Sequence, residues 1–138
     1  MTELKYLCWT KFHSFRYHCF NLYLNNNQKN LEDLLNINMD FDSFKELMAI
    51  ILVGRGDFSN FNKSWNAVDL FLSGISRTNE TETIKLLLRF VLANHWNQNS
   101  HLNVSPPTRF NIDKQAPYLY KFLVVEGISK LKPIKFKT

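Results

Sequence analysis

The chain has few of the residues that stabilise secreted proteins. Among its 138 residues are two cysteines, four glycines and four prolines. Two cysteines do not make the dense disulfide framework of a small secreted domain. The N-terminus also lacks the apolar run and small-residue cleavage site of a signal peptide. We therefore expect an intracellular protein in a reducing compartment, either the cytoplasm or the mitochondrial matrix.

Long apolar runs are missing as well. The uninterrupted apolar run Met48–Val53 is far shorter than the roughly 18–20 residues needed to cross a bilayer. We therefore expect no membrane among the partners of this protein.

Recognised catalytic and cofactor motifs are absent. The sequence contains no G-x-S-x-G, H-E-x-x-H, C-x-x-C or Walker loop. Gly54 and Gly56 form a G-x-G without the third glycine of a dinucleotide loop, and we assign both to a turn that ends a helix. We expect no catalytic residues and no cofactor. A small enzyme that gathers His95 or His101 with an acid remains an alternative.

Only four soft metal ligands lie near one another in the sequence: Cys8, His13, His18 and Cys19. On a helix, Cys8 and Cys19 would lie about 16 Å apart at 1.5 Å per residue. Zinc needs all its ligands within about 2.0–2.3 Å of one point. We therefore expect no metal site, and we interpret the cysteines as small core residues.

Aromatic residues are plentiful, with 12 Phe, 5 Tyr and 3 Trp, so one hydrophobic core is easily filled. The predicted fold is mainly α: a small bundle of about four to five helices with an extended basic C-terminal tail and a possible short strand at 118–125. We divide the chain into a helical domain, 1–105, and a Pro-punctuated basic extension, 106–138, packed on it.

Helical periodicity places the predicted helices. A stripe every three or four residues predicts a helix over 3–23, although the aromatic content there also permits a strand. Asn30 suits the cap of a short helix over 31–36. Ser43 and Glu46 fit a capping box for a helix over 43–53, with Asp42 as the competing cap and Gly54 as the closing residue. Further helices are expected over 64–73, capped by Asn62 or Ser64, and over about 80–95.

The C-terminal third differs from the rest of the chain in its prolines, its apolar run and its clustered lysines. Pro106 and Pro107 exclude a helix at that point. The apolar run Tyr118–Val125 is typical of either a buried strand or a short helix, and periodicity does not decide between them. Pro133 interrupts the lysine-rich segment 129–138, which we expect to be extended.

The net charge of +5 is unevenly distributed along the chain. Residues 1–30 carry +3, residues 31–95 carry −3, and residues 96–138 carry +5. Such asymmetry indicates an acidic partner, often nucleic acid. The alternative is that the basic ends fold back onto the acidic middle of their own chain.

Basic residues alternate with aromatic ones at both ends, as Lys5, Trp9 and Arg16 illustrate at the N-terminus. Lys135, Phe136 and Lys137 illustrate it at the C-terminus. Lysine and arginine neutralise phosphates, while exposed aromatic rings stack on unpaired bases. We therefore hypothesise a non-enzymatic, RNA-associated structural subunit of a larger assembly, such as an organellar ribosomal protein or another ribonucleoprotein component. The sixteen asparagines and many lysines and phenylalanines suggest an AT-rich genome, such as that of an organelle, virus, protist or bacterium. The candidate nucleic-acid-binding residues are Lys5, Lys11, Arg16, Arg109, Lys121, Lys130, Lys132, Lys135 and Lys137.

The alternative hypothesis is a helical protein–protein interaction module, a viral or accessory factor that oligomerises or binds a partner helix. It requires an apolar stripe that the fold leaves uncovered. Its candidate contact face is the N-terminal stripe Leu4, Cys8, Phe12, Phe15, Cys19 and Leu22.

Overall fold

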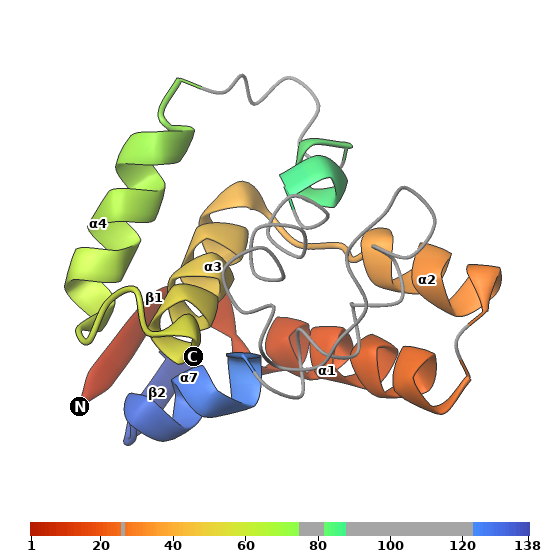
Figure 1. The fold of residues 1–138 in the computed structure, drawn as a ribbon, viewed down its shortest axis with the longest axis horizontal. Helices are drawn as coiled ribbons and strands as arrows, with labels where there is room; N and C mark the ends of the chain where they lie inside the picture. The colour runs from red at the N-terminus through yellow and green to blue at the C-terminus, as the bar shows by residue number, and fades with distance from the viewer. Residues whose placement is uncertain (26, 75–81, 88–122) are drawn as a thin grey trace.

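The structure of the chain, a computed structural model, describes residues 1–25, 27–74, 82–87 and 123–138 (Figure 1). The predicted mainly α class is confirmed, and the described residues hold six helical segments together with two short strands. The sixth segment covers residues 82–87, inside the helix predicted at about 80–95. The labelled elements are β1 (Thr2–Cys8), α1 (Trp9–Leu24), α2 (Gln28–Leu35), α3 (Phe41–Arg55), α4 (Phe61–Leu72), α7 (Val125–Lys130) and β2 (Ile134–Lys137).

The chain begins with a strand, where the sequence predicts a helix. β1 pairs in parallel with β2, with Thr2 opposite Ile134 and Cys8 opposite Lys137. The predicted helix over 3–23 is therefore wrong for its first turns and right from Trp9 onward. Local spacing cannot reveal this, because the partner that satisfies the backbone of β1 lies more than 120 residues away in sequence.

Two side chains of α3 form hydrogen bonds with the backbone of β1. The carboxylate of Glu46 accepts three backbone hydrogen bonds, from the N–H groups of Lys5 (2.8 Å), Tyr6 (2.9 Å) and Leu7 (2.6 Å). The Ser43 hydroxyl donates to the carbonyl of Tyr6 at 3.0 Å. The predicted capping box is therefore wrong. α3 starts at Phe41, so Ser43 and Glu46 lie inside the helix and reach the strand.

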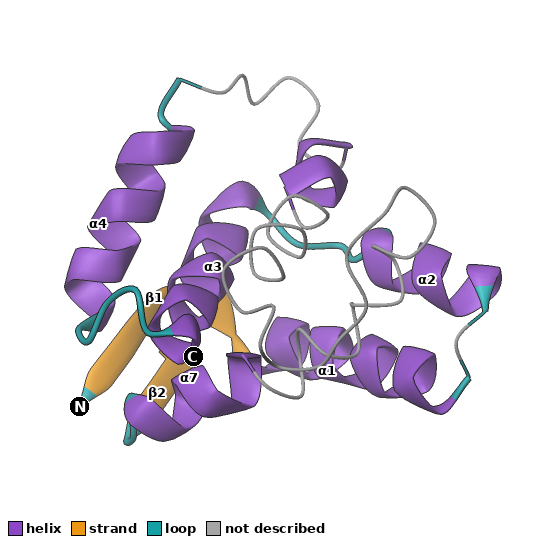
Figure 2. Ribbon diagram, in the orientation of Figure 1, coloured by secondary structure: helices purple, strands orange, loops and turns teal. Residues whose placement is uncertain are grey.

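Helix α3 is the centre of the molecule, and α4, α7 and β1 all pack against it (Figure 2). Most of its side chains are buried, including the apolar run from Leu47 to Ile51. Lys45 is buried as well, where its ammonium pairs with Asp69 of α4 at 2.6 Å and Asp42 at 3.6 Å. Burying a charge is costly unless it is paired, so this network also fixes α4 on α3.

Asparagines cap α2 and α4 earlier than predicted. The side chain of Asn27 accepts from the Asn30 N–H at 2.8 Å, and Asn60 accepts from the Lys63 N–H at 3.2 Å. Ser64, one of the predicted caps, instead donates to the Ala49 carbonyl of α3 at 2.9 Å. The Ser64 hydroxyl therefore bonds to a carbonyl on another helix instead of capping its own helix, as the local pattern had predicted.

Two glycines allow α3 and the C-terminal segment to approach backbone to backbone. A Cβ on Gly54 would collide with the Leu123 carbonyl, and a Cβ on Gly127 would collide with the Ile50 carbonyl. The prediction that Gly54 ends the helix is therefore wrong. Gly56 occupies the left-handed position instead, with φ of 93°, and Arg55 pairs with Asp57 across it.

The C-terminal segment packs onto α3 and β1. Leu123 and Val124 are buried, and the chain is helical from there through α7. The possible strand at 118–125 is therefore wrong for 123–125, while 118–122 lie outside the described residues. The Lys132–Pro133 peptide bond is cis, and Ile134–Lys137 of the predicted extended tail form β2. Ser129 and Lys130, which were also predicted to be extended, belong to α7, so the prediction is wrong for them. The proposed domain boundary at 105/106 also lies outside the described residues.

None of the helices within the described ranges combines the length and apolar character needed to span a membrane.

Candidate nucleic-acid interface

The pairing of β1 with β2 brings the two basic ends of the chain together. β1 leads directly into α1, and β2 follows α7 after a short turn, so the first turns of α1 lie near α7 and β2 (Figure 1). Ring contacts across this junction confirm the proximity. Phe136 of β2 lies 5.1 Å from Phe12 and 5.5 Å from Trp9, measured between ring centroids. Residues from both termini therefore share one surface.

A groove of about 380 Å³ opens between these three elements. We call it the terminal groove. Its volume lies near the lower end of the range for small-ligand sites, roughly 300–1,000 Å³. Its lining combines aromatic and aliphatic side chains with two cations: Trp9, Phe12, Arg16, Val124, Val125, Ile128, Ser129, Lys132 and Phe136.

The aromatic rings that line the groove contact one another. Phe12 is buried, whereas Trp9 keeps 50% of its surface exposed. The Trp9 ring meets Phe136 edge-on, at 73° between ring planes, and His13 stacks near it at 5.8 Å. A half-exposed tryptophan held by three ring contacts offers apolar surface without having to be ordered on binding.

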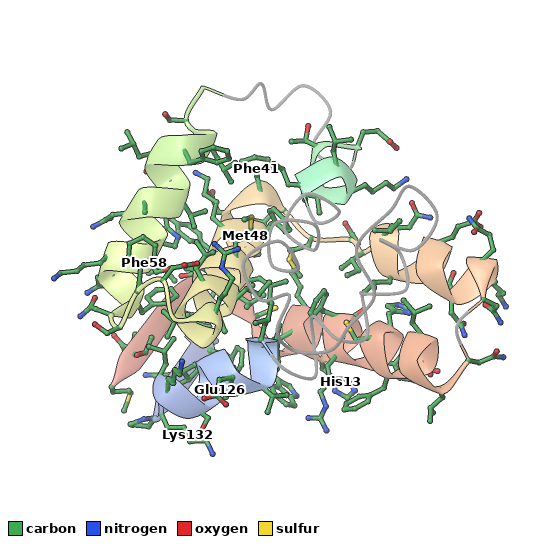
Figure 3. The ribbon with its side chains drawn as sticks, viewed as in Figure 1. His13, Phe41, Met48, Phe58, Glu126 and Lys132 are labelled. Carbon is green, nitrogen blue, oxygen red and sulfur yellow. The ribbon has the colours of Figure 1, made fainter. Side chains whose placement is uncertain are left out.

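The two cations at the groove have no acidic partner among the described residues. The Arg16 guanidinium lies 5.7 Å above the ring of Phe20, and Lys132 is exposed at the edge of the molecule (Figure 3). Glu126, the acid of α7, is not among the residues that line the groove. The groove therefore presents positive charge beside an apolar floor.

The other predicted binding residues are in several different environments. Lys11 pairs with Asp40 at 3.1 Å, and Lys135 pairs with Glu3 at 3.6 Å. The Lys130 ammonium lies 3.4 Å from the carbonyls of Val53 and Gly54, at the C-terminal end of α3. Lys137 is exposed at the end of β2, and Lys5 lines a separate cavity of about 370 Å³. Arg109 and Lys121 lie outside the described residues.

Four acids of the middle segment form ion pairs with bases of the same segment. Asp42 and Asp69 pair with Lys45, Asp57 pairs with Arg55, and Glu82 pairs with Lys85. Glu46 accepts from backbone amides. In the described part of the chain, Asp40 is the one middle-segment acid that forms an ion pair with a predicted binding residue, Lys11. Among the described residues, the alternative that the basic ends neutralise the acidic middle therefore applies to one ion pair.

The apolar stripe that motivated the interaction-module hypothesis is part of the core. Five of its six residues are buried and Cys8 is half-buried. The candidate contact face of that hypothesis is therefore wrong, because α2, α3 and the strands cover it. The residues are Leu4, Cys8, Phe12, Phe15, Cys19 and Leu22.

The cysteines differ in environment. Cys19 is 1% exposed, and burial raises the pKa of its thiol, so it stays protonated. Because the thiolate is the reactive form, alkylation of the native protein should modify Cys8 and spare Cys19. Peptide mass spectrometry after a timed pulse of iodoacetamide measures this. Unfolded protein, the control, should be labelled at both sites. Equal labelling in the native state would contradict the buried position of Cys19.

In the described ranges, no three His, Cys, Asp or Glu side chains gather closely enough to hold a metal ion.

The sequence predicted some of the groove residues but not others. Trp9, Arg16, Lys132 and Phe136 stand out as basic or aromatic residues near the ends, but the floor residues Val124 and Ile128 carry no such signal. They are apolar positions in a segment whose secondary structure the pattern left undecided. Only the tertiary arrangement that brings residues of α1, α7 and β2 to one pocket identifies them as groove residues.

No protein-family model, curated protein or solved structure matches this chain.

Proposed function

We propose that this chain is a non-enzymatic RNA-binding structural subunit of a larger assembly, and that the terminal groove is its RNA-contacting surface. The observation that supports this most is the meeting of the two termini. Parallel pairing of β1 with β2 puts Arg16 from one end and Lys132 from the other beside the same aromatic surface. Cations that have no carboxylate partner within the described ranges, next to exposed rings, suit a phosphate backbone with unpaired bases.

Salt dependence tests this proposal. Replacing Arg16 and Lys132 with glutamine removes two phosphate contacts, so the slope of log K against log salt should shrink by about 1.4, or about 0.7 per contact on a single strand. Fluorescence anisotropy with a labelled RNA oligonucleotide, at several salt concentrations, measures the slope.

A second double variant controls for net charge. Lys29→Gln with Lys63→Gln removes the same charge from exposed positions on α2 and α4, outside the groove. It should leave the slope nearly unchanged. Equal slopes for both double variants would place the RNA contacts elsewhere. Absence of RNA binding by the unmodified protein at about 50 mM salt would overturn the proposal.

The interaction-module hypothesis remains a prediction without its original contact face. Light scattering on the purified chain distinguishes it from the proposal. A defined oligomer with no affinity for RNA supports the interaction module, and a monomer that binds RNA supports the proposed subunit.

A further inference from the structure

We propose that the terminal groove holds an unstacked base of a single strand, so that the protein selects single-stranded over duplex RNA. This inference rests on the proposed function and specifies its substrate. It follows from the shape and chemistry of the groove, not from charge alone.

The groove is concave and its floor is apolar. Phe12 and Val124 are buried beneath it, and Ile128 and Phe136 are half-buried at its sides. A duplex presents a convex backbone with its bases stacked inside, so it would contact only the rim. A planar base that leaves the stack can enter the groove and exchange water for aromatic and aliphatic surface.

The cations lie where the backbone of such a strand would pass. Arg16 comes from α1 and Lys132 from the turn between α7 and β2, and both line the same groove. With a base between them, they can contact the flanking phosphates. Arg16 already lies over the Phe20 ring, so its guanidinium plane has an aromatic support.

Trp9 is the side chain on which the inference depends most. It is half-exposed, it contacts the rings of Phe12, His13 and Phe136, and it lines the groove. A base can stack on the exposed part of this ring. Loss of a base–aromatic stack typically weakens single-strand binding by about fivefold or more.

The test compares single-stranded and duplex RNA of about 12 nucleotides, a length within the range that single-strand modules cover. Anisotropy titrations should show the single strand binding at least about tenfold more tightly than the duplex. Trp9→Ala should weaken single-strand binding about fivefold or more and leave duplex binding unchanged. Trp9→Phe, which keeps a stacking ring, should restore most of the affinity.

Two controls make the outcome decisive. Phe71→Ala removes a comparably exposed aromatic side chain from α4, outside the groove, and should not change either affinity. Duplex binding by Trp9→Ala reports on correct folding. Equal binding of both RNA forms, with Trp9→Ala unaffected, would overturn this inference while leaving the proposed function in place. Loss of all RNA binding by the unmodified protein would overturn both. A single-stranded DNA of the same sequence shows whether the ribose contributes.

Discussion

Replacing Glu46 with alanine is expected to lower the free energy of unfolding by about 3–5 kcal/mol. The side chain is 2% exposed, and its two oxygens accept the N–H groups of Lys5, Tyr6 and Leu7. Without it, these donors lose a charged acceptor and gain no other, and the Leu7 N–H is buried. Since small domains are stable by about 5–15 kcal/mol, this is a large share of the total.

Chemical denaturation followed by circular dichroism measures this loss. Glu46→Gln keeps the shape but offers one acceptor oxygen, and its NH₂ group faces the amides, so we expect a loss of about 2 kcal/mol. Glu32→Gln is the matched control. Glu32 is exposed on α2, and among the described residues its carboxylate accepts one hydrogen bond, from the Gln28 side chain at 3.2 Å. The loss of stability in this control should therefore stay within about 0.5 kcal/mol. Equal stability of the two glutamine variants would contradict the role of Glu46.

The same substitution should affect binding through β1. Glu46 holds the strand on α3, and β1 in turn holds β2, whose Phe136 forms a wall of the terminal groove. Glu46→Gln, measured under conditions where it is folded, should therefore bind single-stranded RNA less tightly than Glu32→Gln. Glu46 acts here as a positioning residue, because it does not line the terminal groove.

Gly127→Ala is expected to destabilise the protein by about 1–2 kcal/mol. The added methyl group would overlap the backbone carbonyl of Ile50, so α7 must move away from α3. Overpacking of this kind typically costs about 1–3 kcal/mol, and backbone atoms cannot rotate aside as a side chain can. Alanine favours a helix over glycine by about 1 kcal/mol, which offsets only part of the loss.

Gly74→Ala is the matched control, because a Cβ at Gly74 would meet nothing within 4 Å. It should be neutral or slightly stabilising. Thermal unfolding of the two variants gives the comparison. If Gly127→Ala unfolds at the same temperature as the unmodified protein, the backbone of α7 at Gly127 does not lie against the Ile50 carbonyl of α3. Displacement of α7 should also widen the terminal groove and weaken RNA binding.

The roles of Ser43 and Glu46 in the structure show that a local sequence pattern does not predict contacts between elements distant in sequence. Their spacing fits a capping box, and the rule for such a box considers only a helix and its own first turn. In the structure, α3 begins at Phe41 and both side chains bond to β1. The same residue types serve either purpose, so the choice is made by an element about 40 residues away in sequence.

The candidate site was partly predictable. Composition alone located positive charge and aromatic rings at both ends, and Trp9, Arg16, Lys132 and Phe136 were among those residues. The pattern could not separate them from Lys11 and Lys135, which pair with acids, or from Lys130, which faces backbone carbonyls. Ion pairing depends on which surfaces meet, and that is a tertiary property.

By itself, the sequence determined a mainly helical fold, the stripes that fill its core, and basic charge at both termini. These follow from periodicity and composition, which act over a few residues or over the whole chain. Only the tertiary structure decided that residues 2–8 form a strand, that Gly54 and Gly127 bring α3 and α7 together, and that the two ends build one groove. Backbone N–H and C=O groups form hydrogen bonds with any suitable partner within reach, so only the folded chain shows which partner each group has.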